Sequence, residues 1–174
     1  MITLYTVDRT GFYLQNKNPE LLKRILNQPE LDDYIANLFP DGVSPHGFRY
    51  FLDSRCDAML SSLELHLEMH RRALYPEKPS RMTSIFCCLT LEEALIFRQN
   101  HGQSDFPIYE VVCDESKIHI GDMEVLKHGG SVLILSHHTS LYWSGGDLRE
   151  FAPNHRPFYE VLVPLPVTIG RQVA

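Results

Sequence analysis

The chain has 174 residues, of which 44% are hydrophobic and 22% charged, and its formal net charge is −6. That size predicts a single domain that buries roughly two-thirds of the surface of its unfolded chain. The acidic balance argues against a general electrostatic attraction to nucleic acid or to an anionic membrane. The four cysteines form no CxxC pair and no apolar run is long enough to span a bilayer, so a reduced cytoplasmic protein with no membrane contact is expected.

Helical signals dominate the first half of the chain. An Asn-Pro pair opens a predicted helix over residues 19–27, and apolar residues at helical spacing predict a second helix over residues 30–39. The longest helix is expected over residues 54–74, with an apolar stripe facing inward. Glu64 and Glu68 are predicted to lie on the wetter sides of this helix.

Strand signals dominate the second half, although the first strand is expected at the start of the chain. The pattern of apolar and β-branched residues predicts strands at residues 1–7, 84–89, 107–113, 131–136 and 159–163. Thr90 and Glu93 form a capping box that opens a helix to about residue 100. Because strands and helices do not alternate as βαβ units, the fold class predicted for residues 1–174 is α+β.

Glu160 stands at the head of the most apolar of these strands. It directly precedes Val161, Leu162 and Val163, and a proline closes the run. A charge at the mouth of a buried strand costs several kcal/mol unless it is paired or solvated. Glu160 is therefore expected either to have a partner or to serve in chemistry.

The segment that begins at Glu160 resembles the Glu-Val-Leu-(Ile/Val)-Pro signature of mono-ADP-ribosyltransferases, in which the Glu is the catalytic carboxylate. Residues 4–9 are similar to the opening strand of that family, and residues 80–97 resemble its middle strand and helix. The resemblance implies a split-sheet core that takes NAD as its substrate and uses no metal. The catalytic residues that it implies are Glu160, Ser84 and Arg9, and the NAD-binding residues are Tyr5, Thr6, Arg9, Arg81, Ser84 and Phe97.

The chemistry explains these residue types. Cleavage of nicotinamide from NAD builds positive charge on the ribose, and one carboxylate such as Glu160 stabilises that charge. A guanidinium binds the pyrophosphate oxygens in a fork, a role open to either Arg9 or Arg81. The hydroxyl of Ser84 has the donor and acceptor groups needed to line the nicotinamide side of the pocket.

The chain also departs from the family at Thr83-Ser84, where a Ser-Thr-Ser triplet would match more closely, and at two further positions. Phe158 stands two residues before Glu160, where arginine-specific relatives carry an acidic residue and asparagine-specific ones a Gln. Phe97 stands where the poly-ADP-ribose branch carries a Tyr. The resemblance therefore predicts the handling of NAD better than it predicts the target.

The predicted function is mono-ADP-ribosylation of a macromolecular acceptor, either protein or nucleic acid, as in a toxin–antitoxin, phage or injected effector system with a neutralising partner. The acceptor is expected at the loop over residues 147–157, near Trp143, Arg149, His155 and Arg156. Two alternatives remain open: an NAD glycohydrolase of the same fold, and a non-enzymatic interaction domain. RNA binding is disfavoured by the net charge of −6 and by the lack of an aromatic-plus-glycine recognition strand.

His66 and His70 are the one pair of histidines at a spacing that clamps a metal on a helix. The zinc-protease pattern requires Glu directly after the first His, but that residue is Leu67. Glu68 is turned about 200° away from His66 around the helix. A solvated helix face is therefore expected, and no metal site is predicted.

Overall fold

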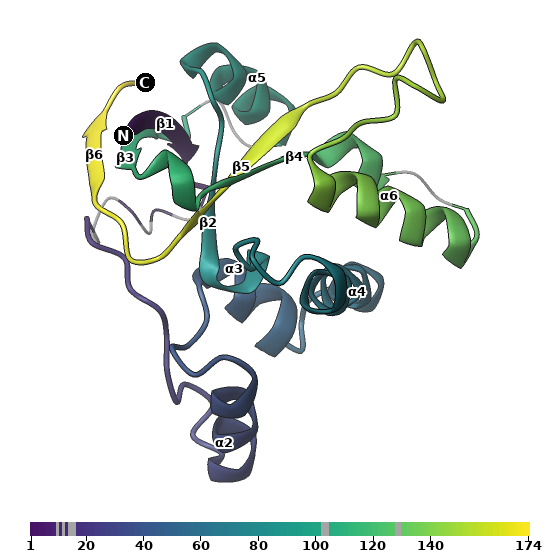
Figure 1. Ribbon diagram of the computed structural model, residues 1–174. Helices are drawn as coiled ribbons and strands as arrows, with labels where there is room; N and C mark the ends of the chain where they lie inside the picture. Colours follow the sequence, from purple (N-terminus) through teal and green to yellow (C-terminus); the bar gives the residue numbers. More distant parts are fainter. Residues whose placement is uncertain (10, 12, 14–16, 102–104, 128–129) are drawn as a thin grey trace.

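Two three-stranded antiparallel sheets form the centre of the computed structural model (Figure 1). The first sheet has the order β1 (Ile2–Val7), β3 (Ile108–Cys113) and β6 (Ile169–Gln172), and the second has the order β2 (Ser84–Cys87), β5 (Tyr159–Pro164) and β4 (His119–Asp122). A single bridge between Tyr5 and Cys88 connects the two sheets. The structure describes residues 1–9, 11, 13, 17–101, 105–127 and 130–174.

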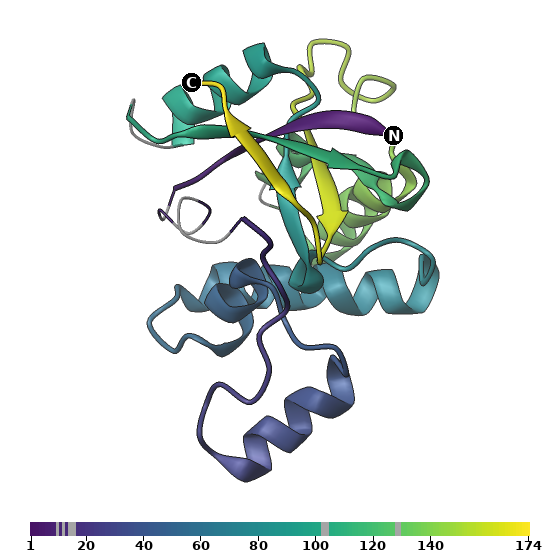
Figure 2. The same ribbon diagram turned by 90° about the vertical axis from the view of Figure 1, so that its left-hand side faces the viewer.

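The described helices lie around these sheets. They are α2 (Pro29–Leu38), α3 (Pro45–Gly47), α4 (Ala58–Leu74), α5 (Leu91–His101) and α6 (Val132–Ser144). A π-helical turn covers Phe48–Leu52, and 3₁₀ turns cover Arg81–Thr83, Glu115–Lys117 and Met123–Lys127. In both ribbon views α2 lies at the end of the molecule farthest from the sheets, with α3 and α4 between them (Figures 1 and 2).

The central strand β5 is buried on both faces because successive side chains of a strand point to opposite sides. Val161 and Val163 belong to the core between the two sheets, which also contains Leu4, Ile85, Tyr109, Val111 and Ile169. Leu162 points the other way, into a second core formed with α4 and α6, which also contains Leu67, Val125, Tyr142 and Trp143. Glu160 is two residues before Leu162, so its side chain is directed toward α4 and α6.

The predicted α+β class is confirmed, and several elements lie where the sequence places them. The first strand, the helix over residues 30–39, and the strands at residues 84–89, 107–113 and 159–163 correspond to β1, α2, β2, β3 and β5. The capping box at the start of α5 is also confirmed. The Glu93 carboxylate accepts from the Thr90 amide at 2.9 Å, and the Glu93 amide donates to the Thr90 hydroxyl at 3.1 Å.

The helix predicted over residues 19–27 is wrong. Leu22 instead pairs its backbone with Val43, through bonds of 2.7 and 3.0 Å in the two directions. Arg24 and Asn27 have positive φ angles of 48° and 55°, which a right-handed helix does not contain. The local Asn-Pro signal was thus overridden by backbone hydrogen bonds to a distant part of the chain.

The strand predicted over residues 131–136 is also wrong, because most of this segment forms the start of α6. Ser131 caps the helix by accepting a hydrogen bond from the Ile134 amide at 3.3 Å, and Gly145 ends it with a φ of 77°. An apolar run without charges has no clear period, so its type is ambiguous. The strands β4 and β6 were not predicted, and Asp122 is the last residue of β4.

Helix α4 begins at Ala58, capped by Asp57, and not at residue 54. Its predicted orientation is only partly right. Leu67 is fully buried, but Met59 is 80% exposed. Glu64 and Glu68, which were expected on the wet sides, are only 7% and 3% exposed. The helix therefore turns two carboxylates toward the protein interior.

Candidate functional site

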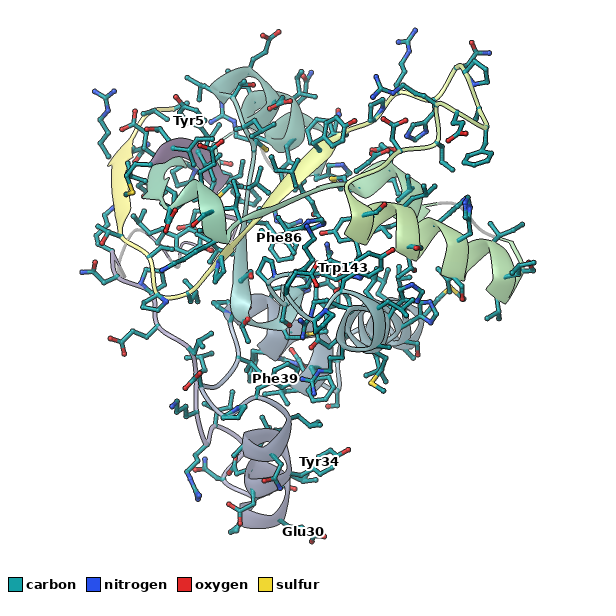
Figure 3. The ribbon with its side chains drawn as sticks, in the orientation of Figure 1. Tyr5, Glu30, Tyr34, Phe39, Phe86 and Trp143 are labelled. Atoms are coloured by element: carbon teal, nitrogen blue, oxygen red, sulfur yellow. The ribbon has the colours of Figure 1, made fainter. Side chains whose placement is uncertain are left out.

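A cavity of about 540 Å³ opens beside the two sheets, a volume within the range of small-molecule sites. Its walls come from β1, β2, β5, α3, α4, α5 and the π-helical turn. Tyr5 and Phe86 lie on two of these strands (Figure 3). Glu160 contributes to the same wall as Arg81 and Glu64.

Arg81 is the centre of a buried ionic cluster on this wall. Its Nε and Nη2 atoms each donate to one oxygen of Glu64 at 2.8 Å, and its Nη1 atom donates to Oε1 of Glu160. Tyr142 accepts from the same Nη1 atom at 2.7 Å and donates to Glu160 Oε1 at 2.7 Å. None of the four residues is more than 9% exposed. Two carboxylates from distant segments therefore share one guanidinium.

The cluster shifts the pKa values of Glu64, Arg81 and Tyr142. Burial alone raises the pKa of a carboxyl group, but Arg81 and His46 hold the pKa of Glu64 well below its usual range. Burial opposes the charge on Arg81, yet Glu160 and Glu64 hold its pKa well above the usual value. Burial raises the pKa of Tyr142 well above its usual value, against the opposing effect of Arg81. Tyr142 thus stays a protonated donor to Glu160.

The two oxygens of Glu160 have different surroundings. Both hydrogen bonds to this carboxylate end on Oε1, and no described residue donates to Oε2. The side chain is 11% exposed and lines the cavity. One oxygen of the carboxylate is therefore held by the protein, and the other remains to interact with a bound molecule.

The local sequence explains how the cluster assembles. Gly121 is the β4 residue paired with Glu160, and a Cβ atom there would lie 2.5 Å from the Tyr142 ring. Glycine thus leaves room for Tyr142 to reach the carboxylate. The hydroxyl of Ser80 accepts from the Met82 amide at 3.1 Å and donates to Glu68 at 2.7 Å. These bonds anchor the 3₁₀ turn that carries Arg81 to α4.

The predicted residues from the first strand and from α5 also line the cavity. The Thr6 hydroxyl donates to the Phe86 carbonyl at 2.9 Å, so this residue ties β1 to β2. Arg9 is exposed, and its guanidinium carbon lies 5.6 Å from the centre of the Phe97 ring. Tyr5 joins them on the wall. With Arg81 and Glu160, six of the seven predicted site residues border one cavity.

Ser84 is the exception. It is fully buried, and its hydroxyl donates to the Ser80 carbonyl at 2.7 Å. This bond closes the 3₁₀ turn that precedes β2, and Ser84 is not among the cavity-lining residues. Its geometry supports a structural role in holding the Arg81 turn.

The sequence reasoning missed several residues of the site. Glu64 was expected on a wetter side of its helix, and Tyr142 was not predicted to belong to the site. His46 and Arg49 line the cavity from a segment that carried no recognised signal. No local pattern identified Glu64, because the exposure of apolar residues of α4 such as Met59 is apparent only in the structure.

The loop expected to contact an acceptor is less available than predicted. Trp143 lies in α6, is fully buried, and donates to the Leu67 carbonyl at 3.0 Å. His155 lies 2.5 Å from Asp122, and Arg149 pairs with Asp147. Of the residues predicted to contact an acceptor, Arg156 is exposed and has no ion pair with a described residue.

No cluster of three or more His, Cys, Asp or Glu side chains in the described ranges is arranged to hold a metal ion. The rings of His66 and His70 lie 5.9 Å apart, and His70 stacks on Tyr75 at 6.2 Å. Over the same described residues, no helix has the length and apolar character needed to cross a bilayer.

The fold and the cavity define an α+β protein with a buried carboxylate cluster at a ligand-sized site. The model of DUF2441, a family of proteins of unknown function, matches residues 44–173. The chain therefore belongs to this family. The matched region includes Glu64, Arg81, Tyr142 and Glu160, and it begins after β1. No curated protein matches the chain.

Proposed function

We propose that the protein is an NAD-dependent mono-ADP-ribosyltransferase in which Glu160 is the catalytic carboxylate. The observation that carries the proposal is the geometry of Glu160. Its Oε1 atom is held by Arg81 and Tyr142, whereas Oε2 has no donor among the described residues and the side chain lines a cavity. A preorganised carboxylate of this kind is suited to stabilising positive charge that develops on a bound substrate.

The arrangement of the sheets supports an ADP-ribosyltransferase-like core. Two separate three-stranded sheets agree with the split core that the resemblance implies. The three segments that carry the resemblance are far apart in the sequence. Even so, Tyr5 from β1, Phe97 from α5 and Glu160 from β5 border the same cavity. This convergence is expected if the segments act together on one substrate.

The proposed reaction places Glu160 beside the ribose that carries nicotinamide. The bond between C1′ and the nicotinamide nitrogen breaks, and its electron pair leaves with neutral nicotinamide. Positive charge then spreads over C1′ and the ring oxygen of the ribose, as in other glycosidic cleavages. Glu160 Oε2 stabilises that charge, while Arg81 and Tyr142 hold the carboxylate in its orientation.

The geometry favours Arg9 over Arg81 as the ligand of the NAD pyrophosphate. The Nε, Nη1 and Nη2 atoms of Arg81 all donate to Glu64, Glu160 or Tyr142. Arg9 is exposed at the cavity wall beside Phe97. Its guanidinium is therefore the one that a phosphate can reach without breaking a buried ion pair.

The acceptor in this proposal is a macromolecule, either protein or nucleic acid. An NAD glycohydrolase is the second candidate, and Phe158 is the observation that favours it. Phe158 lines the cavity two residues before Glu160, and its ring lies 6.3 Å from that of Phe97. The position thus presents an apolar ring where related transferases present an acceptor-binding carboxylate or amide.

The test is nicotinamide release from NAD by the purified protein and by Glu160→Gln, with and without cell extract. The Gln side chain keeps the shape of Glu and removes its charge. We expect kcat to fall by about 100-fold or more, since a single electrostatic group of this kind contributes about 2.7–4 kcal/mol. Release without extract favours the glycohydrolase, whereas release that requires extract favours the transferase.

Glu150→Gln is the matched control, because Glu150 is exposed and does not line the cavity. It should retain wild-type turnover. A wild-type protein that neither releases nicotinamide nor binds NAD by calorimetry would contradict the proposal and favour a non-enzymatic interaction domain. Equal turnover by wild type and Glu160→Gln would rule out the role of Glu160.

A further inference from the structure

His46 forms a part of the cavity wall that the proposed function has not used. Its ring lies 4.6 Å from that of Tyr50 and 4.3 Å from that of Phe86, centre to centre. All three residues line the cavity, and the His46 side chain is 15% exposed. The imidazole is thus held between two aromatic rings with part of its surface open to a ligand.

The segment that carries His46 is fixed to the turn that carries Arg81. Ser44 caps the short helix α3 by accepting from the Gly47 amide at 3.2 Å, and its own amide donates to the Met82 carbonyl at 2.8 Å. A Cβ atom at Gly47 would lie 2.4 Å from the same carbonyl oxygen. Only glycine allows this close approach to Met82. The contact sets the position of His46 relative to Arg81, the residue before Met82.

Nε2 of His46 faces the carboxylate of Glu64, although the two groups do not have hydrogen-bond geometry. The Nε2 atom lies 3.2 Å from Oε2 of Glu64. Two lone pairs at that distance would repel, so Nε2 is assigned as protonated and the remaining lone pair of the neutral ring is on Nδ1. No described residue forms a hydrogen bond with Nδ1. The charged or titratable groups around the ring are Glu64 from α4, Arg81 from its 3₁₀ turn, Arg49 and Tyr50 from the π-helical turn, and Glu160 from β5, which shares Arg81 with Glu64.

Three other groups of the cavity wall, Glu64, Glu160 and Cys88, are less suited to accept a proton. Both oxygens of Glu64 accept from Arg81, and Oε1 of Glu160 accepts from Arg81 and Tyr142. Burial raises the pKa of the Cys88 thiol to about 12, which leaves it protonated and unreactive at neutral pH. Nδ1 of His46, in contrast, carries a lone pair that no described residue uses, on a ring that lines the cavity.

We propose that His46 is the general base that accepts the proton of an O–H nucleophile attacking C1′ of the NAD ribose, an inference that rests on the proposed function. The O–H bond breaks and its proton moves to Nδ1 of His46. The C1′–O bond forms as the bond to the nicotinamide nitrogen breaks, and nicotinamide leaves with that electron pair. Glu64 stabilises the imidazolium that results. The nucleophile is water in hydrolysis and a hydroxyl group of the acceptor in transfer.

The experiment measures nicotinamide release as a function of pH for wild type, His46→Gln and the control His137→Gln. His137 lies on α6, contacts Phe151 and does not line the cavity. We expect kcat of His46→Gln to fall by about 100-fold with KM changed less than about twofold, the lower range of general-base effects. The fall in rate at acid pH, where an imidazole is protonated, should be present in wild type and in His137→Gln and absent in His46→Gln.

Methanol serves as a minimal hydroxyl nucleophile, and mass spectrometry separates its methyl glycoside from the ADP-ribose formed with water. Loss of both products in His46→Gln supports His46 as the base for water and for a hydroxyl nucleophile. Loss of one product assigns the base to the nucleophile that forms that product. His46→Ala with added imidazole should recover part of the rate, which a structural role would not produce.

A folded His46→Gln protein with the same rate and pH profile as wild type would overturn the inference. The proposed function would remain intact. A lower rate with an unchanged acid limb and no rescue by imidazole would overturn it as well, because His46 would then act only in packing. A wild-type protein without nicotinamide release contradicts the proposed function, and the inference fails with it.

Discussion

Glu64 and Glu68 lie one turn apart on α4, and comparison of their surroundings separates a structural ion cluster from a candidate site. Both are buried, and both pair with arginines. Burial tends to raise the pKa of each carboxyl group, but the hydrogen bonds and charges of neighbouring groups lower it in both cases. By burial and by charge state, the two carboxylates are nearly equivalent.

The two carboxylates differ in the further groups that their arginine partners contact. Glu68 accepts from Arg71, Arg72 and Ser80, with donors on both oxygens. The two arginines then donate to backbone carbonyls, among them that of Leu38. Arg81, in contrast, connects Glu64 to a second carboxylate, that of Glu160. The Glu68 cluster also borders a cavity, of about 430 Å³, so what distinguishes the Glu64 cluster is the Oε2 atom of Glu160, which has no donor among the described residues.

The largest expected effect comes from removing the cation that two carboxylates share. Arg81→Met should leave Glu64 and Glu160 buried without a counter-charge and lower the free energy of unfolding by about 3–5 kcal/mol. Urea denaturation measures the change. Arg149→Met removes an arginine that is 59% exposed and should leave the stability unchanged within error. Equal changes in the free energy of unfolding would show that the buried cluster contributes no more to stability than a surface ion pair.

Glu64→Gln and Glu68→Gln test the comparison directly. Each removes a charge that accepts hydrogen bonds from arginine, so each should lower the free energy of unfolding by about 2–3 kcal/mol. Their effects on nicotinamide release should differ. Glu64→Gln should lower kcat by about tenfold because it disturbs both Arg81 and His46, whereas Glu68→Gln should retain wild-type kcat per folded molecule. Parallel losses of activity in both variants would abolish the distinction between the two clusters.

The fold was predictable where one local signal dominated. The capping box of Thr90 and Glu93 and the helical spacing of α2 needed no information from distant residues. Residues 19–27 failed because Leu22 pairs with Val43, a contact that no local pattern encodes. The segment 131–136 failed because an uncharged apolar run suits a strand and a buried helix equally well. The short strands β4 and β6 depend on pairing with neighbours that their own residues do not reveal.

The site was predictable in part for the same reason. Glu160 stood out because a charge before three apolar strand residues is unusual in a local window. Glu64 joins it through Arg81, 17 residues away from Glu64, and Tyr142 contacts it directly from 18 residues away. The requirement for glycine at position 121 follows from the path of the Tyr142 ring, which the three-dimensional structure alone defines.

The smallest expected effect concerns Arg9, the exposed counterpart of Arg81 on the cavity wall. If Arg9 binds the NAD pyrophosphate, Arg9→Gln should raise KM for NAD by about tenfold, or about 1.4 kcal/mol, with kcat and thermal stability unchanged. Arg24→Gln is the control, because Arg24 is exposed, pairs with Asp33 and lies outside the cavity. An unchanged KM in Arg9→Gln would show that the phosphates bind elsewhere. Arg49 would then be the residue to substitute, since it is the other exposed arginine of the wall, and Arg81 cannot take this role without giving up a buried carboxylate.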